Sequence, residues 1–179
     1  MARNVEIKAR LADPGAARRR VESLADGPPE VLDQTDTFFS VAGGRLKLRE
    51  TAGRGAELIF YERRDDPDPV ESRYERVPVG DAPALRAVLA AALGVRGEVI
   101  KRRQLFRAGR TRIHLDEVRG LGTFLELEVE LRDGAPAKAG QEEARRLLRA
   151  LEIEPAELVA EAYVDLLGRV AGGSAGPGE

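Results

Sequence analysis

Polar and apolar residues alternate along most of this chain, and the alternation predicts strands. Glycine pairs, prolines and short polar runs separate the alternating segments, as turns between antiparallel strands do. The segment TFLELEVEL, near the end of the series, alternates most strictly. The predicted strands span residues 3–11, 31–41, 45–51, 57–63, 71–79, 98–107, 110–118 and 123–131.

Other segments repeat their apolar residues at helical spacing. The first contains Asp13 and Pro14, a cap and a first-turn residue typical of a helix start. The second follows Asp81 and ends at Gly94. Two more amphipathic segments follow the last strand. The predicted helices span residues 13–26, 82–94, 141–151 and 155–170.

Charged residues gather on one face of nearly every predicted strand, because strand positions of equal parity point the same way. In the first strand, Glu6 and Lys8 share a face opposite Ile7. The corresponding positions in later strands are Arg45, Lys47, Arg49, Glu57, Tyr61, Arg63, Arg73, Glu75, Lys101, Arg103, Arg112, His114, Asp116, Glu126, Glu128 and Glu130.

An antiparallel sheet with one face in water shows the same alternation, and such a face needs no function. Two features favour a different arrangement. The charges are sorted by sign, because bases dominate the middle strands and carboxylates fill the last. Of the 4 lysines in the chain, 3 fall on this face: Lys8, Lys47 and Lys101. We therefore interpret the charged faces as one continuous surface.

The helices suggest where that surface lies. Four amphipathic helices need an apolar sheet face to cover, so the charged face becomes the lumen if the sheet closes into a barrel. We expect an α+β fold, a closed eight-stranded antiparallel β-barrel with a charged lumen, flanked by about four helices. Residues 1–170 form a single domain in this interpretation, and residues 171–179 form a disordered tail.

A lumen with many bases repels itself unless it holds an anion of high charge. Carboxylates among the bases suit divalent cations that travel with that anion. A polyphosphate with Mg²⁺ or Mn²⁺ matches both signs of charge. A membrane barrel would instead need aromatic girdles facing lipid, and the chain has only 3 Tyr and 5 Phe.

Composition excludes several other classes of function. The chain carries 29 Lys and Arg against 31 Asp and Glu, so its net charge is −2 and general binding to nucleic acid is disfavoured. It has no Cys and a single His, which excludes thiolate zinc sites and sites with several His ligands. No apolar run approaches the ~18 residues of a membrane span, and the start lacks a signal peptide, so we expect a cytoplasmic protein.

The ordered set of motifs resembles the CYTH superfamily, also called triphosphate tunnel metalloenzymes. NVEIKARL resembles its Glu-x-Glu-x-Lys opening, and QTDTFF and RLKLRE resemble its next two strands. SRYE and KRR resemble its later Arg-x-Glu and basic strands. IHLDEVRGLGTFLELE resembles the closing segment, and the match runs in order from about residue 3 to 167. The sequence of these motifs is most similar to the class IV adenylyl cyclase-like branch of the superfamily.

This resemblance implies roles for individual residues. The carboxylates would hold one or two Mg²⁺ or Mn²⁺ ions, and the bases would clamp the triphosphate. The expected metal ligands are Glu6, Glu126, Glu128 and Asp116, although a salt bridge to Arg112 is an alternative for Asp116. The expected triphosphate ligands are Lys8, Lys47, Arg49, Arg63, Arg73, Lys101, Arg103 and Arg112. Lys8, Arg49 and Arg103 are the expected catalytic residues among them.

The sequence departs from the family pattern at two places. Asn4 stands where many members have the first Glu, so one metal site carries less charge here. In the fourth strand, where many members end with Lys, Arg63 is the nearest base in phase with Tyr61. His114 is in phase with the lumen; a structural hydrogen bond is its simpler interpretation, and acid–base work is the alternative. Core packing is the simpler interpretation of Tyr61 and Phe60, and contact with a base or organic group at the tunnel mouth is the alternative.

The resemblance implies an enzyme that cleaves a phosphoanhydride bond of ATP, thiamine triphosphate or tripolyphosphate. A class IV adenylyl cyclase-like enzyme converts ATP to cyclic AMP and pyrophosphate. A triphosphatase releases the terminal phosphate with water. A non-catalytic polyphosphate- or nucleotide-binding module is the third possibility, because Asn4 removes a charged metal ligand. Neither a membrane nor nucleic acid is an expected partner, and the oligomeric state is left open.

Overall fold

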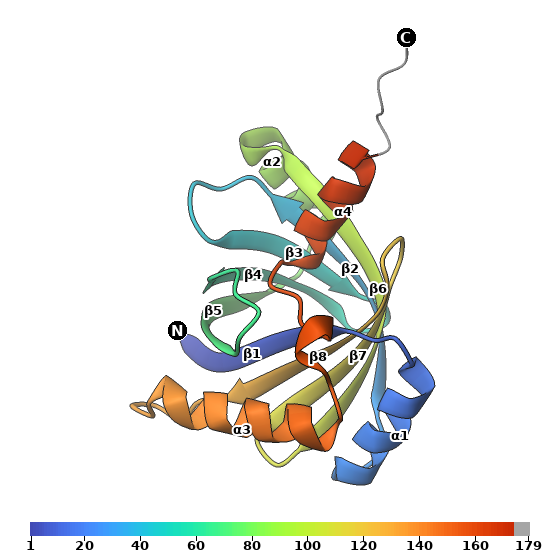
Figure 1. The fold of residues 1–179 in the computed structure, drawn as a ribbon. Helices are drawn as coiled ribbons and strands as arrows, with labels where there is room; N and C mark the ends of the chain where they lie inside the picture. Colours follow the sequence, from blue (N-terminus) through green and yellow to red (C-terminus); the bar gives the residue numbers. More distant parts are fainter. Residues whose placement is uncertain (174–179) are drawn as a thin grey trace.

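Strands from both halves of the chain pair side by side in one antiparallel barrel (Figure 1). The computed structural model describes residues 1–173. Around the barrel the strand order is β1-β5-β4-β3-β2-β6-β7-β8, and β8 pairs with β1 to close it. The strands are β1 (Ala2–Arg10), β2 (Glu30–Phe39), β3 (Arg45–Thr51), β4 (Gly55–Arg63), β5 (Val70–Val79), β6 (Val95–Ala108), β7 (Thr111–Val118) and β8 (Gly122–Glu130).

Four α-helices in the described residues flank this barrel, and the predicted fold class is confirmed. None of them is long and apolar enough to cross a membrane. The helices are α1 (Pro14–Leu24), α2 (Ala82–Leu93), α3 (Ala137–Ala150) and α4 (Tyr163–Gly173).

The apolar face of the barrel points outward, where helices cover it. Val5 and Ile7 of β1 and Leu127 of β8 are buried in one cluster with residues of α1 and α3. In Figure 1, α3 crosses the outside of the barrel beside β1 and β8. Burial of this apolar face stabilises the fold and leaves the charged face to line the lumen.

A second apolar cluster closes one end of the barrel. Tyr163 and Val164 at the start of α4 pack against Phe38, Val99 and Phe124. Phe124 and Tyr163 meet edge to face, with ring centroids 5.0 Å apart. The cluster anchors α4 over that end, where Figure 1 shows it standing above the strand ends.

The prediction of one helix over residues 155–170 is wrong. Residues 155–157 form a single 3₁₀ turn, and α4 begins only at Tyr163. Between them, residues 158–162, which we call the strap, cross the end of the barrel without helical structure. Leu158 bridges to Ala9, and the Val159 N–H donates to the Lys8 carbonyl at 2.9 Å. These contacts with β1 outweigh the helix propensity of the segment.

Smaller differences concern element ends. The helix expected at residues 141–151 begins earlier, at Ala137, and the strand expected at 98–107 begins at Val95. Of the predicted tail, residues 171–173 complete α4. Residues 174–179 lie outside the described part of the chain.

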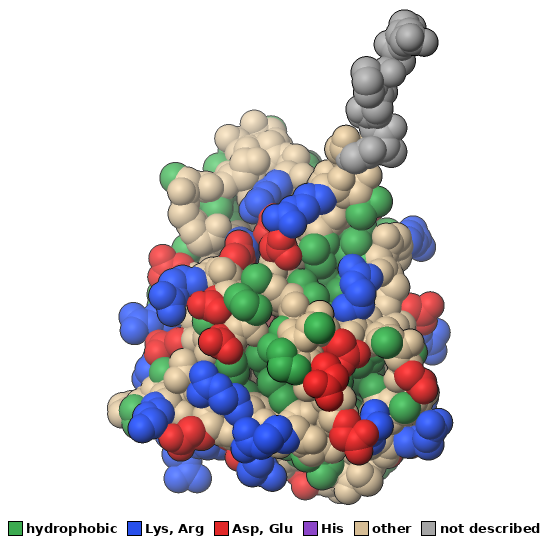
Figure 2. All heavy atoms as spheres, in the orientation of Figure 1, with side chains coloured by type: hydrophobic (Ala, Val, Ile, Leu, Met, Phe, Trp, Pro, Cys, Tyr) green, Lys and Arg blue, Asp and Glu red, His purple; other side chains and the backbone are tan. Residues whose placement is uncertain are grey.

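Acidic and basic side chains are mixed on the outer face seen in Figure 2. Red and blue side chains alternate over this face, with hydrophobic ones between them, and no large area of one sign forms there. On this face, the sorting of charges by sign that the sequence shows is therefore absent.

Candidate functional site

All strands of the barrel contribute to one internal cavity of about 390 Å³. Ala162 and Tyr163 line it at the end that the strap crosses. The volume falls within the range of small-molecule sites, about 300–1,000 Å³. The lining is mostly polar and charged, so the cavity suits a small anion better than an apolar ligand.

The structure brings most of the predicted site residues to this cavity. Their positions follow directly from strand parity, because equal parity places side chains on the inner face. The predicted bases that line the cavity are Lys8, Lys47, Arg49, Arg63, Lys101, Arg103 and Arg112. The predicted metal ligands that line it are Glu6, Glu126 and Glu128, and Glu30, Asp36 and Glu57 line it as well.

Arg73 does not belong to this set, and its predicted position in the lumen is wrong. Its side chain is 59% exposed, and its Nε donates to Glu71 at 2.9 Å on the outside of the barrel. The inner positions of β5 are instead Ser72, Tyr74 and Arg76. The same shift of one position places Glu75, an expected lumen residue, outside.

Asp116 is fully buried beside the cavity, where Arg103 and Tyr163 occupy its oxygens. The Arg103 guanidinium donates to both carboxylate oxygens, at 2.7 and 2.6 Å, and the Tyr163 hydroxyl donates at 3.1 Å. Burial works to raise the pKa of Asp116, but the charges of Arg103 and Lys101 outweigh it and lower that pKa to about 2. The expected salt bridge is therefore present with Arg103 instead of Arg112, and Asp116 positions a base.

Asp36 is the main site residue that the sequence analysis did not single out. Its carboxylate accepts from Arg49 at 2.7 Å, from Lys47 at 3.0 Å and from Lys101 at 3.4 Å. Burial works to raise the pKa of Asp36, but these three positive charges hold it well below its usual range. One buried carboxylate thus gathers three predicted phosphate ligands. Its place in QTDTFF, in phase with Gln34, was the available signal.

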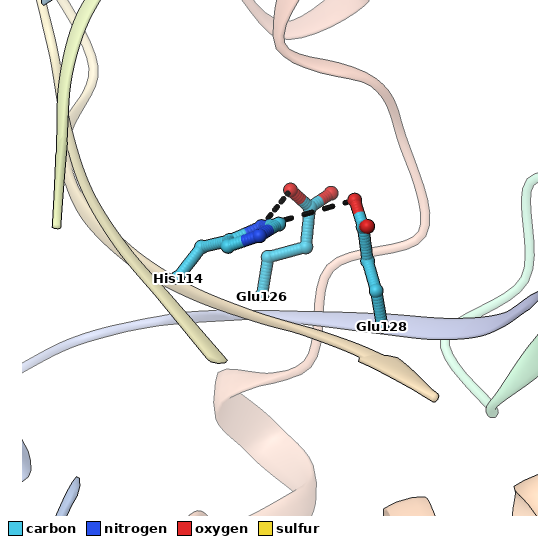
Figure 3. Close-up of side chains that lie close together, drawn as sticks. All are labelled: His114, Glu126 and Glu128. Carbon is cyan, nitrogen blue, oxygen red and sulfur yellow. Dashed lines mark hydrogen bonds and ion pairs between the residues drawn. The ribbon is translucent and has the colours of Figure 1, made fainter. Parts of the chain in front are cut away.

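A cluster of possible metal ligands lies on β7 and β8 (Figure 3). His114 Nδ1 is 3.3 Å from an oxygen of Glu126 and 3.8 Å from an oxygen of Glu128. Glu6 on β1 lies opposite Glu128 in the strand register. Burial raises the pKa of Glu6 to about 7, and the nearby charge of Glu126 adds to the effect. Burial and the charge of Arg103 lower the pKa of His114, which favours the neutral imidazole that binds metals.

Each predicted metal ligand in the cavity is paired with a predicted phosphate ligand. Glu6 lies 2.6 Å from Arg63, and Glu126 lies 2.7 Å from Arg103. Arg112 lies 2.7 Å from Glu128. The carboxylates and bases therefore neutralise one another in the free protein, and a metal ion and an anion that bind together would each replace one partner.

Asn4 also lines the cavity, two positions before Glu6 on the same face of β1. Its side chain is buried, with 3% of the residue exposed, and its amide oxygen has no hydrogen-bond partner within residues 1–173. A buried oxygen without a donor costs free energy unless a ligand or water satisfies it. The position predicted to weaken a metal site therefore still offers an oxygen atom.

Two tyrosines of the cavity were not among the predicted site residues. Tyr61, for which core packing was the simpler interpretation, lines the cavity, and burial raises its pKa above the usual value. Tyr163 lies under Lys8, whose Nζ is 4.2 Å from the centre of the ring. Lys8 also donates to the Glu161 carbonyl in the strap at 3.2 Å. No strand pattern marks Tyr163, because it belongs to a segment with helical spacing.

Comparison with known sequences gives matches over nearly the whole chain. A family model described as the CYTH domain matches residues 2–163. A protein of Methanocaldococcus jannaschii named "Putative adenylate cyclase MJ0240" is 32% identical over 172 residues. The alignment covers 92% of this chain and 98% of that protein.

Solved structures share the fold at lower identity. The PH1012 protein of Pyrococcus horikoshii superposes with a TM-score of 0.82 at 21% identity, over 91% of this chain and 98% of that one. A Hippeastrum protein described as "Putative adenylyl cyclase HpAC1", with "a dominant" triphosphatase activity, superposes with a TM-score of 0.64 at 17% identity. That match covers 94% of this chain and 96% of the other.

Proposed function

Because the chain belongs to the CYTH domain family, we propose that it is a divalent-metal-dependent enzyme that cleaves a phosphoanhydride bond of a triphosphate held in the barrel. One observation carries this proposal. Seven predicted bases from five strands line a single cavity that they share with three predicted carboxylate ligands and an imidazole. A chain of phosphates with its metal ion is the small ligand that matches this combination of charges.

The residues of the cavity fit a divalent cation. Glu6, Glu126 and Glu128 supply carboxylate oxygens, which Mg²⁺ and Mn²⁺ prefer, and Asn4 adds its unpartnered amide oxygen. When bound, the ion would withdraw charge from phosphate oxygens and orient them. The protein itself contributes positioning, because phosphoryl transfer depends mainly on held geometry and neutralised charge.

The bases have three different surroundings in the cavity. Lys47, Arg49 and Lys101 are gathered by Asp36. Arg63, Arg103 and Arg112 are each paired with a predicted metal ligand, so they can bind phosphate oxygens when those carboxylates turn to the metal. Lys8 contacts Glu126 at 3.8 Å and stands at the strap end. We assign the catalytic roles to Lys8, Arg49 and Arg103, one from each of these surroundings.

A class IV adenylyl cyclase-like reaction is the form of this activity that we favour. The 3′-hydroxyl of ATP would attack the α-phosphorus and release pyrophosphate with cyclic AMP. The name of the Methanocaldococcus relative supports this form. Leu32 and Leu105 line the cavity away from the strap, and apolar side chains there suit the organic part of a nucleotide.

Hydrolysis of the terminal phosphate is the second candidate. Water would attack the γ-phosphorus of thiamine triphosphate, tripolyphosphate or a nucleoside triphosphate and release orthophosphate. The activity described for the Hippeastrum protein supports it, because that protein carries a cyclase name as well. The two forms use the same bases and metal ligands and differ in which phosphorus is attacked.

Product identity tests the proposal and separates its two forms. The protein is incubated with ATP, tripolyphosphate or thiamine triphosphate, each with Mg²⁺ or Mn²⁺, and the products are read by phosphorus NMR. We expect pyrophosphate and cyclic AMP from ATP. Orthophosphate would establish the triphosphatase instead, and the absence of any product from all three would contradict an enzyme.

The carboxylates provide a matched test of metal dependence. Glu126→Gln or Glu128→Gln should reduce turnover on the order of 100-fold, because each removes a charged metal ligand from the cavity. Glu117→Gln is the control, since Glu117 lies on the neighbouring strand β7 but is exposed and does not line the cavity. Rates are compared by initial-velocity measurements, and wild-type rates in both cavity variants would contradict the assignment.

A non-catalytic binding module remains the third candidate because of Asn4 alone. If the uncharged amide has cost the protein its turnover, the wild type binds tripolyphosphate without cleaving it, and Asn4→Glu gains activity. Substantial turnover by the wild-type protein would remove this candidate.

A further inference from the structure

We propose that His114 is itself a metal ligand, and that with Glu126 and Glu128 it forms a mixed nitrogen–oxygen site that prefers Mn²⁺ to Mg²⁺. The inference deepens the proposed function, since it concerns which ion occupies the cavity and which side chain selects it. Carboxylates alone bind both ions, whereas Mg²⁺ takes oxygen ligands almost exclusively. An imidazole ligand would therefore change the choice of metal.

Strand register builds the three-residue cluster. His114 on β7 pairs directly with Glu126 on β8, and Glu128 is the next residue on the same face. In Figure 3 the edge of the imidazole ring points toward both carboxylates. The cluster therefore rests on two neighbouring strands of a closed barrel and not on a mobile loop.

The distances in the cluster suit a shared cation. Metal–ligand bonds of about 2.1 Å at angles between octahedral and tetrahedral place neighbouring donor atoms about 3.0–3.4 Å apart. His114 Nδ1 lies 3.3 Å from Glu126 Oε2 and 3.8 Å from Glu128 Oε1. Small rotations of the glutamate side chains are enough to bring all three atoms onto one ion.

The second ring nitrogen gives an independent indication. His114 is 1% exposed, and its Nε2 has no hydrogen-bond partner in the described residues. A neutral imidazole that donates from Nδ1 to Glu126 leaves the Nε2 lone pair buried and unused. With a metal ion on Nδ1, the ring proton would instead be carried by Nε2, which would then be a donor to a water molecule or phosphate oxygen bound with the ion.

The arginines that hold the two glutamates in the free protein can release them. Arg103 still donates hydrogen bonds to both carboxylate oxygens of Asp116, at 2.7 and 2.6 Å. Arg112 still donates a hydrogen bond to the Glu130 carboxylate at 2.9 Å. When Glu126 and Glu128 turn to a metal ion, neither guanidinium is left without an acidic partner, so the exchange does not strand a buried charge.

The chain contains 1 His, and this makes the test direct. Tag-free protein is loaded with Mn²⁺ in the absence of any triphosphate, and pulsed electron paramagnetic resonance measures coupling to ¹⁴N. A histidine coupling can arise only from His114. We expect it in the wild-type protein and expect His114→Gln to abolish it.

Calorimetry of Mn²⁺ and Mg²⁺ binding gives the second readout. We expect wild-type protein to bind Mn²⁺ at least about tenfold more tightly than Mg²⁺, and His114→Gln to narrow that ratio severalfold. Thr111→Val is the matched control: Thr111 lies on the same strand, is buried at 1% exposure and does not line the cavity. The ratio of Mn²⁺ to Mg²⁺ affinity in Thr111→Val should equal that of the wild-type protein.

A structural role for His114 makes the opposite prediction. The absence of ¹⁴N coupling in Mn²⁺-loaded wild-type protein would overturn the proposal, even if His114→Gln does not fold. An unchanged Mn²⁺/Mg²⁺ ratio in a folded His114→Gln variant would also overturn it. Neither readout uses turnover, so the two proposals can fail separately. Cleavage of triphosphates without this coupling would refute His114 as a metal ligand but not the proposed function. Coupling without cleavage would refute the proposed function but not the role of His114.

Discussion

Asp36 organises three bases with a single carboxylate, and its removal should have two opposite effects. Asp36→Asn leaves Lys47, Arg49 and Lys101 buried without their common partner. We expect a loss of about 3 kcal/mol in the free energy of unfolding, as when one member of a buried ion pair is removed. Tripolyphosphate should then raise the melting temperature more than it does in the wild type, because it replaces the lost charge.

Asp33→Asn is the control for this prediction. Asp33 lies on the same strand, but its side chain is 62% exposed and its contact with Arg102 is 4.0 Å long. A change of at most about 0.5 kcal/mol is expected there. Thermal unfolding with and without tripolyphosphate measures both variants, and equal behaviour of the two would refute the role of Asp36.

Lys101 predicts how binding depends on pH. Burial and the neighbouring charge of Arg103 lower the pKa of Lys101 to about 7. At pH 8 the free amine is mostly neutral, and a bound triphosphate favours its charged form, so binding takes up about one proton there. At pH 6 the amine is already charged. Affinity should therefore fall as pH rises through about 7.

Calorimetry in buffers of different ionisation enthalpy measures that uptake for tripolyphosphate. Lys101→Arg is the comparison, because a guanidinium keeps its proton at both pH values. The difference in uptake between wild type and variant at pH 8 isolates Lys101 from the titration of the ligand. No difference would mean that Lys101 does not titrate on binding.

The residue scale also shows why one parity assignment failed. In β1 and β8 one parity is apolar and the other charged, so the inner face is evident from the sequence. In β5 both parities carry polar groups: Glu71, Arg73 and Glu75 on one side, Ser72, Tyr74 and Arg76 on the other. The alternation of polar and apolar residues shows which side of a strand faces the lumen only where one side is polar and the other apolar.

At the scale of elements, α3 depends on a glycine. A Cβ atom at Gly140 would lie 2.7 Å from a methyl of Val5 and 2.9 Å from a methyl of Leu131. Gly140 therefore lets α3 lie close against β1. We expect Gly140→Ala to cost about 1–3 kcal/mol through this overlap, more than the gain in helix propensity returns.

Gly168 in α4 offers the opposite case, because a Cβ there would have no atom of the described part of the chain within 4 Å. Gly168→Ala should raise stability by about 0.5–1 kcal/mol. Denaturant titration of the two variants tests the contrast directly. A gain in stability from Gly140→Ala would show that α3 can move away from the barrel.

The strap marks the limit of local patterns at this scale. Strands and most helices were predictable because their periodicity and their tertiary contacts agree. Residues 158–162 have helical spacing, yet the backbone of Val159 bonds to Lys8, and the Ala160 carbonyl accepts from Arg63 at 2.7 Å. Those partners lie about 100 residues or more away in sequence, so no local pattern contains them.

For the whole molecule, the charged lumen predicts a response to polyanions. Tripolyphosphate with Mg²⁺ should raise the melting temperature, because it binds the folded state and relieves repulsion among the bases. At 100 times its dissociation constant the expected stabilisation is about 2.7 kcal/mol, or at least about 5 °C for a chain of this size. Differential scanning calorimetry measures the shift.

Inorganic phosphate at equal ionic strength is the control, and it should produce a smaller shift, since one phosphate spans fewer of the bases. Equal shifts with both anions would point to general salt effects. No shift with tripolyphosphate at millimolar concentration would contradict an anion site in the lumen.

At this scale the sequence predicted much of what is observed. Sorted charges, an apolar outer face and amphipathic helices together indicated an inside-out barrel, and the structure has one. The pairing of cavity side chains was not predictable in the same way. Arg103 lies opposite Asp116 in the β6–β7 register and Asp36 lies opposite Arg49 in the β2–β3 register, and the alternation of polar and apolar residues does not fix which residues lie opposite one another. That Lys101 also reaches Asp36 depends on the pairing of β2 with β6, which lie far apart in sequence.

The closure of the barrel by β1 and β8 also determines when the protein can fold. Val5 pairs with Val129, so the ring is complete only after more than 120 further residues have followed β1. At a synthesis rate of about 5–20 residues per second, the first strand must wait roughly 6–25 s for this neighbour. Partners so distant in sequence also make folding slow. Until then β1 carries an exposed pairing edge, and the nascent chain is most open to aggregation during that interval.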